Sequence, residues 1–402
     1  MTWLDLPPDT LFGTANLPYG VFSREDAAPR VGVRIGDAVL DLSAVLDDPV
    51  FAEPSLNFFL AQGRIRWTSV RERIIELLTG EEHRAKVEPA LYPLAGVRLH
   101  LPFLVGDYVD FYANEFHASN VGRIFRPDSA PLTPNWKHLP IGYHGRSGTV
   151  VVSGTPVIRP RGQRKARAEA APTFGPSRQL DIEAEVGFLI GSGSTLGEPV
   201  GVEEFAEHVF GVFLVNDWSS RDLQAWEYVP LGPFLGKSFA TSVSPWIVPL
   251  EALDYARVEP PPRDPEPLPY LADTEKWGLD LALEVRINGH VVAQPPFSSM
   301  YWTPAQMLAH LTVNGASVRT GDFYASGTVS GPLPAQRGSL LELSWGGQEP
   351  ITLPDGTRRA FVEDDDEVTI TASAPGPAGT RIGFGEVTGR VLPARRPRKP
   401  LR

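Results

Sequence analysis

Short runs of alternating apolar and polar residues, separated by tight turns, are the feature that most limits how this chain can fold. Leu279–Ile287 alternates in this way, Asn288-Gly289 supplies the positive φ angles of a hairpin turn, and His290–Ala293 follows as a returning strand. Val368–Ala372 has the same strand pattern. The chain shows no repeated alternation of strands with helices, which argues against a doubly wound parallel sheet. The pattern predicts a mainly β protein with a few short helices.

Helical patterns occur at three places. The stretch Arg64–Leu78 has apolar residues every three to four positions, and Gly80 is a typical helix end. A short helix is expected over Glu203–Phe210. Another is expected where Thr303 caps a helix with Pro304 at its first position.

The sequence changes character near residue 100. Residues 1–100 read as a small β-rich domain with one helix and no cluster of chemically active side chains, and residues 101–402 as a larger domain that contains all such clusters. The stretches 159–176 and 259–269 are rich in Pro, Gly or charge and are predicted to be exposed loops. The basic stretch Arg395–Arg402 is predicted to be a solvated tail.

Composition excludes several classes of function. The chain has 402 residues and no cysteine, so disulfides, thiolate metal sites and a cysteine nucleophile are absent. A net charge of −11 argues against nucleic-acid binding. No apolar run is long enough for a membrane span, and the N-terminus lacks the pattern of a secretion signal. We expect a cytoplasmic protein that acts without nucleic acid or membrane.

Acidic residues on predicted strands form the clearest chemical pattern. Asp181, Glu183 and Glu185 are spaced by two and share one strand face, either as a solvated outer face or around a bridging cation. Asp217 follows a long apolar run and Asp110 lies among aromatics, so both are expected to be partly buried and to need partners. Carboxylate ligands of this kind suit Ca²⁺, Mg²⁺ or Mn²⁺.

Histidine and basic residues complete the candidate chemistry. His117 lies seven residues after Asp110, where it could activate a water beside a metal. Glu342 lies between apolar residues in a predicted strand, either as an outward-facing residue or as the group that orients the histidine.

A dense polar run follows Asn216. Arg221 and Gln224 share a helical face, and Lys237 follows a Gly-Pro-rich loop, so these groups suit a carboxylate or an oxyanion. Alternatively, the two cations neutralise Asp222 and Glu227 nearby.

Several longer segments resemble the fumarylacetoacetate hydrolase family, in order, from about residue 10 to about residue 393. They are DYVDFYANEFHASNVGRIFR, PNWKHLPIGYHGRSGTVVVSGTP, LDIEAEVGF, NDWSSRDLQAWEYVPLGPFLGKSFATSVSPW, YWTPAQMLAHLTVNG, ASGTVSGP and GSLLELSWGG. The resemblance implies a small SH3-like N-terminal barrel over residues 1–100, a larger C-terminal β-roll domain over 101–402, and a homodimer.

The resemblance also implies a role for each matched site residue. The implied metal set is Asp110, Glu183, Glu185 and Asp217, with Lys237 and Thr241 near the metal site. The implied catalytic groups are His117 as general base, Glu342 as its orienting partner, and Arg221, Gln224 and Lys237 as groups that hold the substrate and the leaving fragment. The implied substrate contacts are Tyr112, Arg126, Tyr143, Tyr228 and Thr328. Asp181 is not a ligand in the family, although its spacing groups it with Glu183 and Glu185.

The activity implied is hydrolysis of the carbon–carbon bond of 4-fumarylacetoacetate, a dicarboxylate diketo acid, to fumarate and acetoacetate with Ca²⁺ and/or Mg²⁺. One alternative is a hydrolase or decarboxylase of a related acylpyruvate with the same metal core. A second alternative is a Ca²⁺-dependent binding module, for which a paired His117 and Glu342 would have no use.

Overall fold

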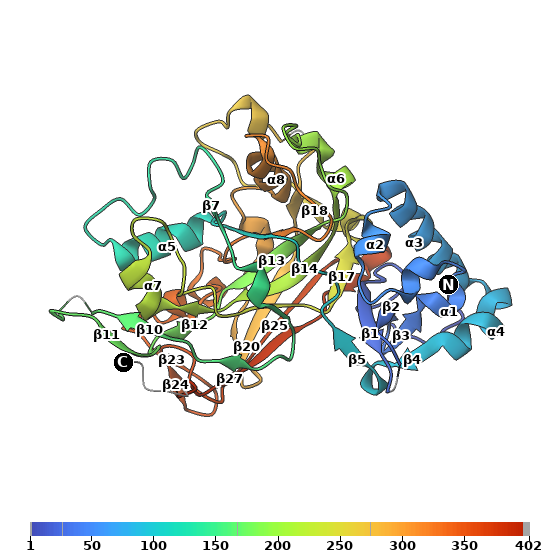
Figure 1. The fold of residues 1–402 in the computed structure, drawn as a ribbon, viewed down its shortest axis with the longest axis horizontal. Coiled ribbons are helices and arrows are strands. Elements are labelled where there is room, and N and C mark those ends of the chain that lie inside the picture. Colours follow the sequence, from blue (N-terminus) through green and yellow to red (C-terminus); the bar gives the residue numbers. More distant parts are fainter. Residues whose placement is uncertain (1, 26, 167, 274, 397–402) are drawn as a thin grey trace.

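The computed structural model describes residues 2–25, 27–166, 168–273 and 275–396. Over this part of the chain the structure is mainly β with a few short helices, as the alternating runs predict. Its strands form a 13-stranded sheet, a six-stranded sheet and four two-stranded ribbons. Figure 1 shows the N-terminal strands and helices on one side of the molecule, with the remaining chain gathered around the larger sheets.

The first hundred residues contribute five strands and a long helix. The strands are β1 (Tyr19–Ser23), β2 (Arg30–Ile35), β3 (Ala38–Asp41), β4 (Leu91–Pro93) and β5 (Arg98–His100), and the short helices are α1 (Leu42–Val45), α2 (Asn57–Leu60) and α4 (Arg84–Val87). The long helix α3 (Arg64–Thr79) confirms the predicted helix to within one residue. Its buried face carries Trp67, Ile74 and the apolar residues between and after them, and Gly80 closes the last turn as predicted.

The large sheet connects the two parts of the chain. Its main order is β4-β3-β2-β1-β17-β14-β13-β22-β6-β7. Its later strands are β6 (Tyr108–Phe111), β7 (Gly142–His144), β8 (Val150–Val152), β13 (Ala184–Ile190), β14 (Val209–Asp217), β16 (Thr241–Val243), β17 (Trp246–Pro249) and β22 (Phe323–Ala325). Tyr19 of β1 pairs with Ile247 of β17, so hydrogen bonds run from the N-terminal strands into the middle of the molecule. Every residue of β13 and β14 is buried, and polar side chains on these strands therefore lie away from water.

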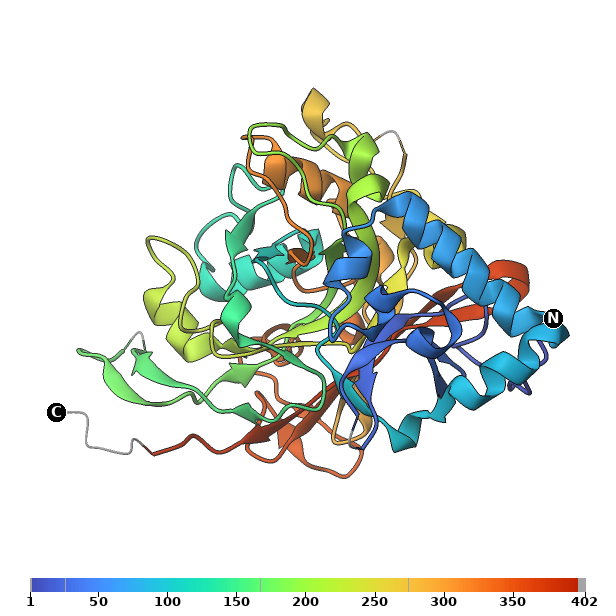
Figure 2. The same cartoon turned by 45° about the vertical axis from the view of Figure 1, so that its right-hand side comes forward.

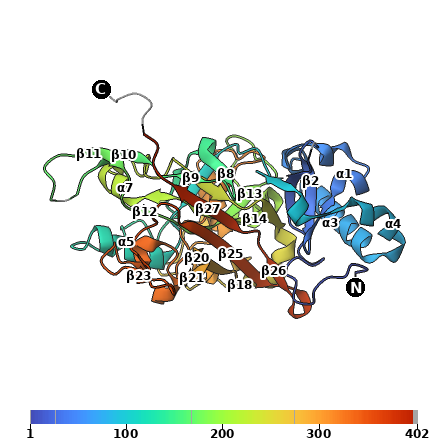
Figure 3. The ribbon, with the colours of Figure 1, turned by 90° about the horizontal axis from the view of Figure 1, so that it is seen from below.

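The six-stranded sheet contains the predicted hairpin and crosses below the large one (Figure 3). Its strands are β9 (Val157–Ile158), β20 (Ala282–Ile287), β21 (His290–Ala293), β25 (Glu367–Pro375), β26 (Arg381–Gly383) and β27 (Val387–Leu392). Asn288 and Gly289 have φ of 51° and 79°, the left-handed pair that a tight hairpin turn requires. Buried residues alternate with half-buried ones along β25, so this sheet covers the core with one face.

Two helix predictions had different outcomes. α8 (Pro304–Thr312) begins as predicted, with a capping box between Thr303 and Gln306. The helix predicted over Glu203–Phe210 was too long, because only a 3₁₀ turn and α6 (Phe205–His208) form before β14 begins at Val209. The apolar residues after α6 are fully buried in the central sheet, and this tertiary burial outweighs local helical preference.

The stretch 159–176 is not only a loop. β10 (Arg161–Arg164) and β11 (Thr173–Pro176) pair as a hairpin arm that projects from the molecule (Figure 2). The stretch 259–268 has no regular structure, in line with its prediction. The predicted basic tail lies, from residue 397 onward, outside the described residues.

Among the described residues, every helix is too short or too polar to cross a lipid bilayer.

Candidate active site

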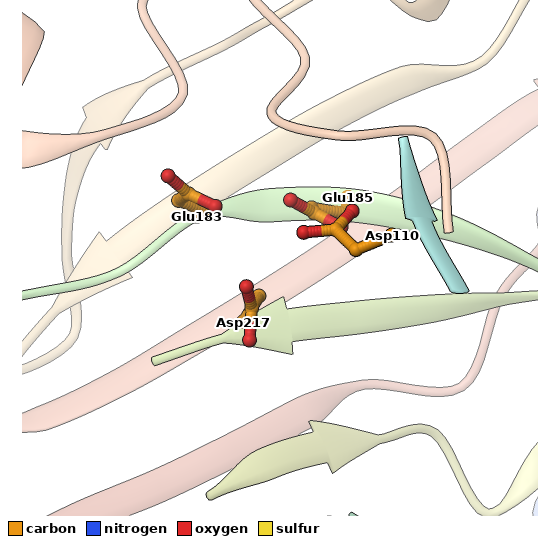
Figure 4. A group of neighbouring side chains, drawn as sticks. All are labelled: Asp110, Glu183, Glu185 and Asp217. Carbon is orange, nitrogen blue, oxygen red and sulfur yellow. The ribbon is translucent and has the colours of Figure 1, made fainter. Parts of the chain in front are cut away.

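Four carboxylates from three strands of the large sheet meet in the interior (Figure 4). Asp110 lies on β6, Glu185 on β13, Asp217 at the end of β14, and Glu183 just before β13. One oxygen from each lies within 4.8 Å of the others. The strands bring them together because β13 pairs with both β14 and β22, and β22 pairs with β6.

The solvated-face interpretation of the sequence pattern is wrong. Asp181, Glu183 and Glu185 are 0%, 5% and 0% exposed. The predicted single strand over this segment is interrupted, because β12 (Leu180–Asp181) pairs with β15 (Ser219–Ser220) while β13 starts at residue 184. The break separates Asp181 from the cluster of four, and its side chain has other partners.

Part of the acidic cluster lacks protein partners. Oδ1 of Asp110 and both carboxylate oxygens of Glu185 are buried without a hydrogen-bond partner among the described residues. Burial, followed by the neighbouring carboxylates, raises the pKa of Asp110 and of Glu185 well above the ordinary values. Buried anionic oxygens of this kind need a proton or a cation, and a set of carboxylates suits a hard divalent ion. The donor set therefore fits the divalent metal that the sequence predicts.

Two cations lie on the other side of the cluster. Lys237 Nζ contacts Glu183 and donates to Oδ2 of Asp217 at 2.6 Å, and Arg221 Nη1 lies 2.8 Å from Oε1 of Glu183. Burial opposes the charge on Lys237, but Asp217 and Glu183 hold its pKa above the ordinary value. Burial likewise opposes the charge on Glu183, and the two cations hold its pKa well below the usual range. In this protonated form the Lys237 side chain has no lone pair and cannot bind a metal. It lies beside the predicted metal ligands as a positive charge, as the resemblance implies.

The alternative partners considered for these cations are not used. Asp222 accepts hydrogen bonds from Ser177 Oγ at 2.7 Å and from the backbone N–H of Arg178 at 2.8 Å. Glu227 accepts one from the backbone N–H of Gly236 at 3.0 Å. The cations face the buried cluster instead.

His117 and Glu342 form a buried pair. His117 lies in α5 (Glu115–Phe125), and its Nδ1 is 2.7 Å from Oε2 of Glu342. Burial alone would raise the pKa of Glu342, but His117 and the side-chain donors Asn120 and Ser339 hold it below the ordinary value. Because the ionised carboxylate can only accept, Nδ1 carries the shared proton. Nε2 then faces the acidic cluster, 3.9 Å from Oε1 of Glu183.

Glu342 lies on a helix, not on the predicted strand. α9 (Leu340–Leu343) is a single turn whose N-cap, Ser339, accepts from the Glu342 N–H. The alternating apolar residues around Glu342 suggest a strand, but the Ser-x-x-Glu spacing is a helix-start signal that would have identified the turn. Sequence reasoning missed the donors to this carboxylate, which are Asn120 at 2.9 Å, Ser330 at 2.9 Å and Ser339 at 2.9 Å. The Asn120 position, three residues after His117 on one helix face, was a further signal.

A cavity of about 440 Å³ opens beside the cluster and brings most predicted site residues together. Its lining includes Asp110, Tyr112, His117, Arg126, Tyr143, Glu183, Arg221, Gln224, Tyr228, Lys237 and Thr328. Arg221 is the first residue of α7 (Arg221–Glu227), and its Nη1 donates to Gln224 at 3.1 Å, as their spacing predicts. Nη2 of Arg221 and Oγ1 of Thr328 are buried, and neither has a partner in the described part of the chain.

The remaining predicted residues lie around this cavity. Glu185 and Glu342 do not line it and stand behind residues that do. Asp217 and Thr241 line a smaller neighbouring cavity of about 140 Å³ that shares Tyr143 and Lys237 with the first. Tyr143 donates to Oδ2 of Asp217 at 3.1 Å and Thr241 to Oδ1 at 3.2 Å, so both hold a predicted metal ligand.

Comparison with known proteins identifies the family. The family model for the fumarylacetoacetate hydrolase C-terminal region matches residues 108–392, and the fumarylacetoacetase N-terminal model matches residues 15–102. The chain belongs to the fumarylacetoacetate hydrolase family. The fumarylacetoacetase of Homo sapiens is 47% identical over 98% of this chain and 99% of its own length. That of Arabidopsis thaliana is 44% identical over 98% of both chains.

Solved structures share the fold of this family. A fumarylacetoacetate hydrolase from Exiguobacterium antarcticum covers 94% of this chain and 100% of its own, with a TM-score of 0.57 and 20% identity. A maleylpyruvate hydrolase from Sphingobium, solved with manganese and pyruvate, covers 94% and 100%, with a TM-score of 0.55 and 16% identity. At 20% and 16% identity, these two comparisons show a shared fold.

Proposed function

We propose that this chain hydrolyses the carbon–carbon bond of 4-fumarylacetoacetate to fumarate and acetoacetate, the last step of tyrosine and phenylalanine catabolism. Relatives that are 44% and 47% identical over nearly the full chain carry the name fumarylacetoacetase, which supports this substrate. The observation that carries the proposal is the 2.7 Å pair between His117 and Glu342, set against the acidic cluster at one cavity. A module that only binds Ca²⁺ has no need of this pair.

His117 acts as the general base. With the Nδ1 proton held by Glu342, Nε2 keeps a free lone pair and accepts a proton from a water in the cavity. The carboxylate of Glu342 then stabilises the imidazolium that forms. The resulting hydroxide adds to the carbonyl carbon that becomes the new carboxylate of fumarate.

A divalent cation would be held by Asp110, Glu183, Glu185 and Asp217, and we propose Ca²⁺ and/or Mg²⁺. When bound, it polarises the oxygens of the diketo group and stabilises negative charge on the enolate. The manganese in the Sphingobium maleylpyruvate hydrolase supports a divalent ion in this fold. Lys237 and Thr241 adjoin this metal set, where Lys237 balances part of its charge.

Positive and polar side chains hold the substrate while the bond breaks. The electron pair of the broken bond stays on the acetoacetate carbon as an enolate, which is then protonated. We assign Arg221, Gln224 and Lys237 to that fragment, because all three line the cavity, where Arg221 donates to Gln224 and both cations contact Glu183. The proposed substrate contacts are Tyr112, Arg126, Tyr143, Tyr228 and Thr328.

We also propose that residues 1–100 form an SH3-like barrel with a helix and residues 101–402 a β-roll domain, through which two chains form a homodimer. The separate family models for 15–102 and 108–392 support this division. Light scattering at several protein concentrations tests the dimer. The cytoplasmic location expected from the sequence stays a prediction.

The direct assay follows the ultraviolet absorbance of fumarylacetoacetate with and without a chelator. We expect turnover that stops on full metal removal and returns with Ca²⁺ or Mg²⁺. His117→Ala should lower kcat at least ~100-fold, whereas His290→Ala on the distant strand β21 should not change it. Turnover that survives metal removal or His117→Ala contradicts this mechanism. If fumarylacetoacetate is inert and a shorter acylpyruvate is cleaved, the alternative substrate is correct.

A further inference from the structure

Asp181 is a buried carboxylate with no role in the mechanism described so far. It is 0% exposed and accepts four hydrogen bonds. Arg221 Nε and the backbone N–H of Leu341 donate to Oδ2, at 2.8 and 2.9 Å. The backbone N–H groups of Leu340 and Ile182 donate to Oδ1, at 2.7 and 2.8 Å. Every partner is a donor, so both carboxylate oxygens act as hydrogen-bond acceptors.

Three of these donors belong to two different parts of the proposed site. Arg221 is the first residue of α7 and offers a buried Nη2 with no partner among the described residues. Leu340 and Leu341 form the first turn of α9, and the next residue is Glu342, which holds His117. A helix of four residues has little stability of its own, so its position depends on outside contacts. Asp181 is one such contact, and it is shared with Arg221.

We propose that Asp181 is a positioning residue that fixes Arg221 and Glu342 relative to each other. The inference rests on the proposed function, in which Arg221 holds the substrate while Glu342 orients His117. Through its two oxygens Asp181 sets the distance between the guanidinium and the base, and therefore the place of the substrate relative to the attacking water. Asp181 itself does not line the cavity.

The test uses an isosteric change and a matched control. Asp181→Asn replaces one acceptor oxygen with an NH₂ group, which would face N–H donors. Asp366 is the control, because it is also buried (2% exposed) and accepts from a guanidinium and a backbone N–H. It lies next to β25 in the other sheet, outside the cavity lining. Asp366→Asn should therefore lower stability as Asp181→Asn does, without affecting the reaction.

Kinetics should separate the two variants at a temperature where both are folded. We expect Asp181→Asn to lower kcat roughly 100-fold, the effect of a misplacement of about 1 Å. It should also raise KM about tenfold by freeing Arg221. Asp366→Asn should leave both constants within about twofold of the parent. In an Arg221→Gln background, Asp181→Asn should no longer raise KM. In a Glu342→Gln background, most of its effect on kcat should disappear.

Two kinetic outcomes overturn the inference. One is that the Asp181→Asn variant keeps the parental kcat and KM. The other is that its effects on kcat and KM are fully additive with those of Arg221→Gln and of Glu342→Gln. An inactive parent chain would contradict the proposed function instead. The positioning role is then measured by a crystal structure of Asp181→Asn, in which an unmoved Arg221 side chain and α9 would refute it.

Discussion

Glu183 and Asp217 lie against Lys237, whereas Asp110 and Glu185, in the same cluster, form no ion pair with any described residue. All four carboxylates are between 0% and 5% exposed, so burial does not distinguish the two pairs. Their partners do. The protein holds Glu183 ionised, while Asp110 and Glu185 keep oxygens that only a proton or a bound cation can satisfy.

The carboxylates of the cluster outnumber the cations that contact them, and this imbalance favours binding of a metal ion. Arg221 is shared between Glu183 and Asp181, so the four carboxylates, Asp181 and the two cations Lys237 and Arg221 give a formal charge of 2 − 5 = −3 with every acid ionised. A divalent cation offsets most of this excess negative charge. Burial still raises the pKa of Asp217 against the pull of Lys237, so even the partnered side is not fully compensated. The partnered half thus holds the geometry, and the unpartnered half supplies affinity for a cation.

The largest expected effect comes from removing the cation of the partnered half. Lys237→Met leaves Glu183 and Asp217 buried without their ammonium, and breaking a buried ion pair in this way costs about 3–5 kcal/mol. We expect the free energy of unfolding of the metal-free protein to fall by about that amount, measured by urea denaturation. The control is Lys137→Met, which removes a half-exposed pair with Glu115 and should change stability by no more than about 1 kcal/mol. Equal effects of the two substitutions would contradict the comparison.

Divalent cations should act on the unpartnered half. Ca²⁺ or Mg²⁺ at 100 times its dissociation constant should stabilise the native protein by about 2.7 kcal/mol, because it binds the folded cluster and not the unfolded chain. Thermal denaturation in chelator and in added metal measures this. The stabilisation should be largely lost in Asp110→Asn, since its Oδ1 is one of the oxygens without a partner. No shift in the melting temperature with any divalent ion would rule out the metal site.

The sequence predicts those parts of this structure that depend on local contacts. The hairpin around Asn288-Gly289 and the capped start of α8 need only their own neighbours, and both form as predicted. The same holds for the helical pair of Arg221 and Gln224. Contacts between residues that are distant in the sequence are not predicted in this way, because no spacing rule places Asp181 opposite Arg221.

The assembly of the site depends on long-range pairing that alternation does not encode. Asp110 meets Asp217 because β6, β22, β13 and β14 pair in that order. The sequence pattern predicts both as partly buried candidate ligands, but only the family resemblance assigns them to one metal set. The break between β12 and β13, which removes Asp181 from the cluster, is set by the pairing of β12 with β15. The sequence pattern predicts a strand at Glu342, because a one-turn helix whose first N–H groups donate to the distant Asp181 has almost no periodicity of its own.

Glu185→Gln tests the unpartnered half in the opposite direction from Lys237→Met. Replacing a buried, unpaired carboxylate by a neutral amide should stabilise the metal-free protein by about 1–2 kcal/mol at neutral pH. Burial raises the pKa of Glu185 in the folded state, so the folded protein binds the proton more tightly than the unfolded chain. Stability of the metal-free parent should therefore fall as the pH rises above the ordinary glutamate value towards that raised pKa. Glu185→Gln should show a flatter profile, and a destabilised variant would contradict the assignment.

The smallest expected effect concerns Glu342, another buried carboxylate with several protein partners. Asn120 donates to its Oε1. Asn120→Ala removes one of several donors to that carboxylate, while the bonds from His117, Ser330 and Ser339 remain. Since one net hydrogen bond is worth about 1 kcal/mol, we expect kcat to fall roughly fivefold with KM unchanged. Ser119→Ala, next to it on α5, serves as the control and should leave both constants unchanged. A change in KM alone would mean that Asn120 acts on the substrate and not on the pair of His117 with Glu342, because orientation of the base matters only once the substrate is bound.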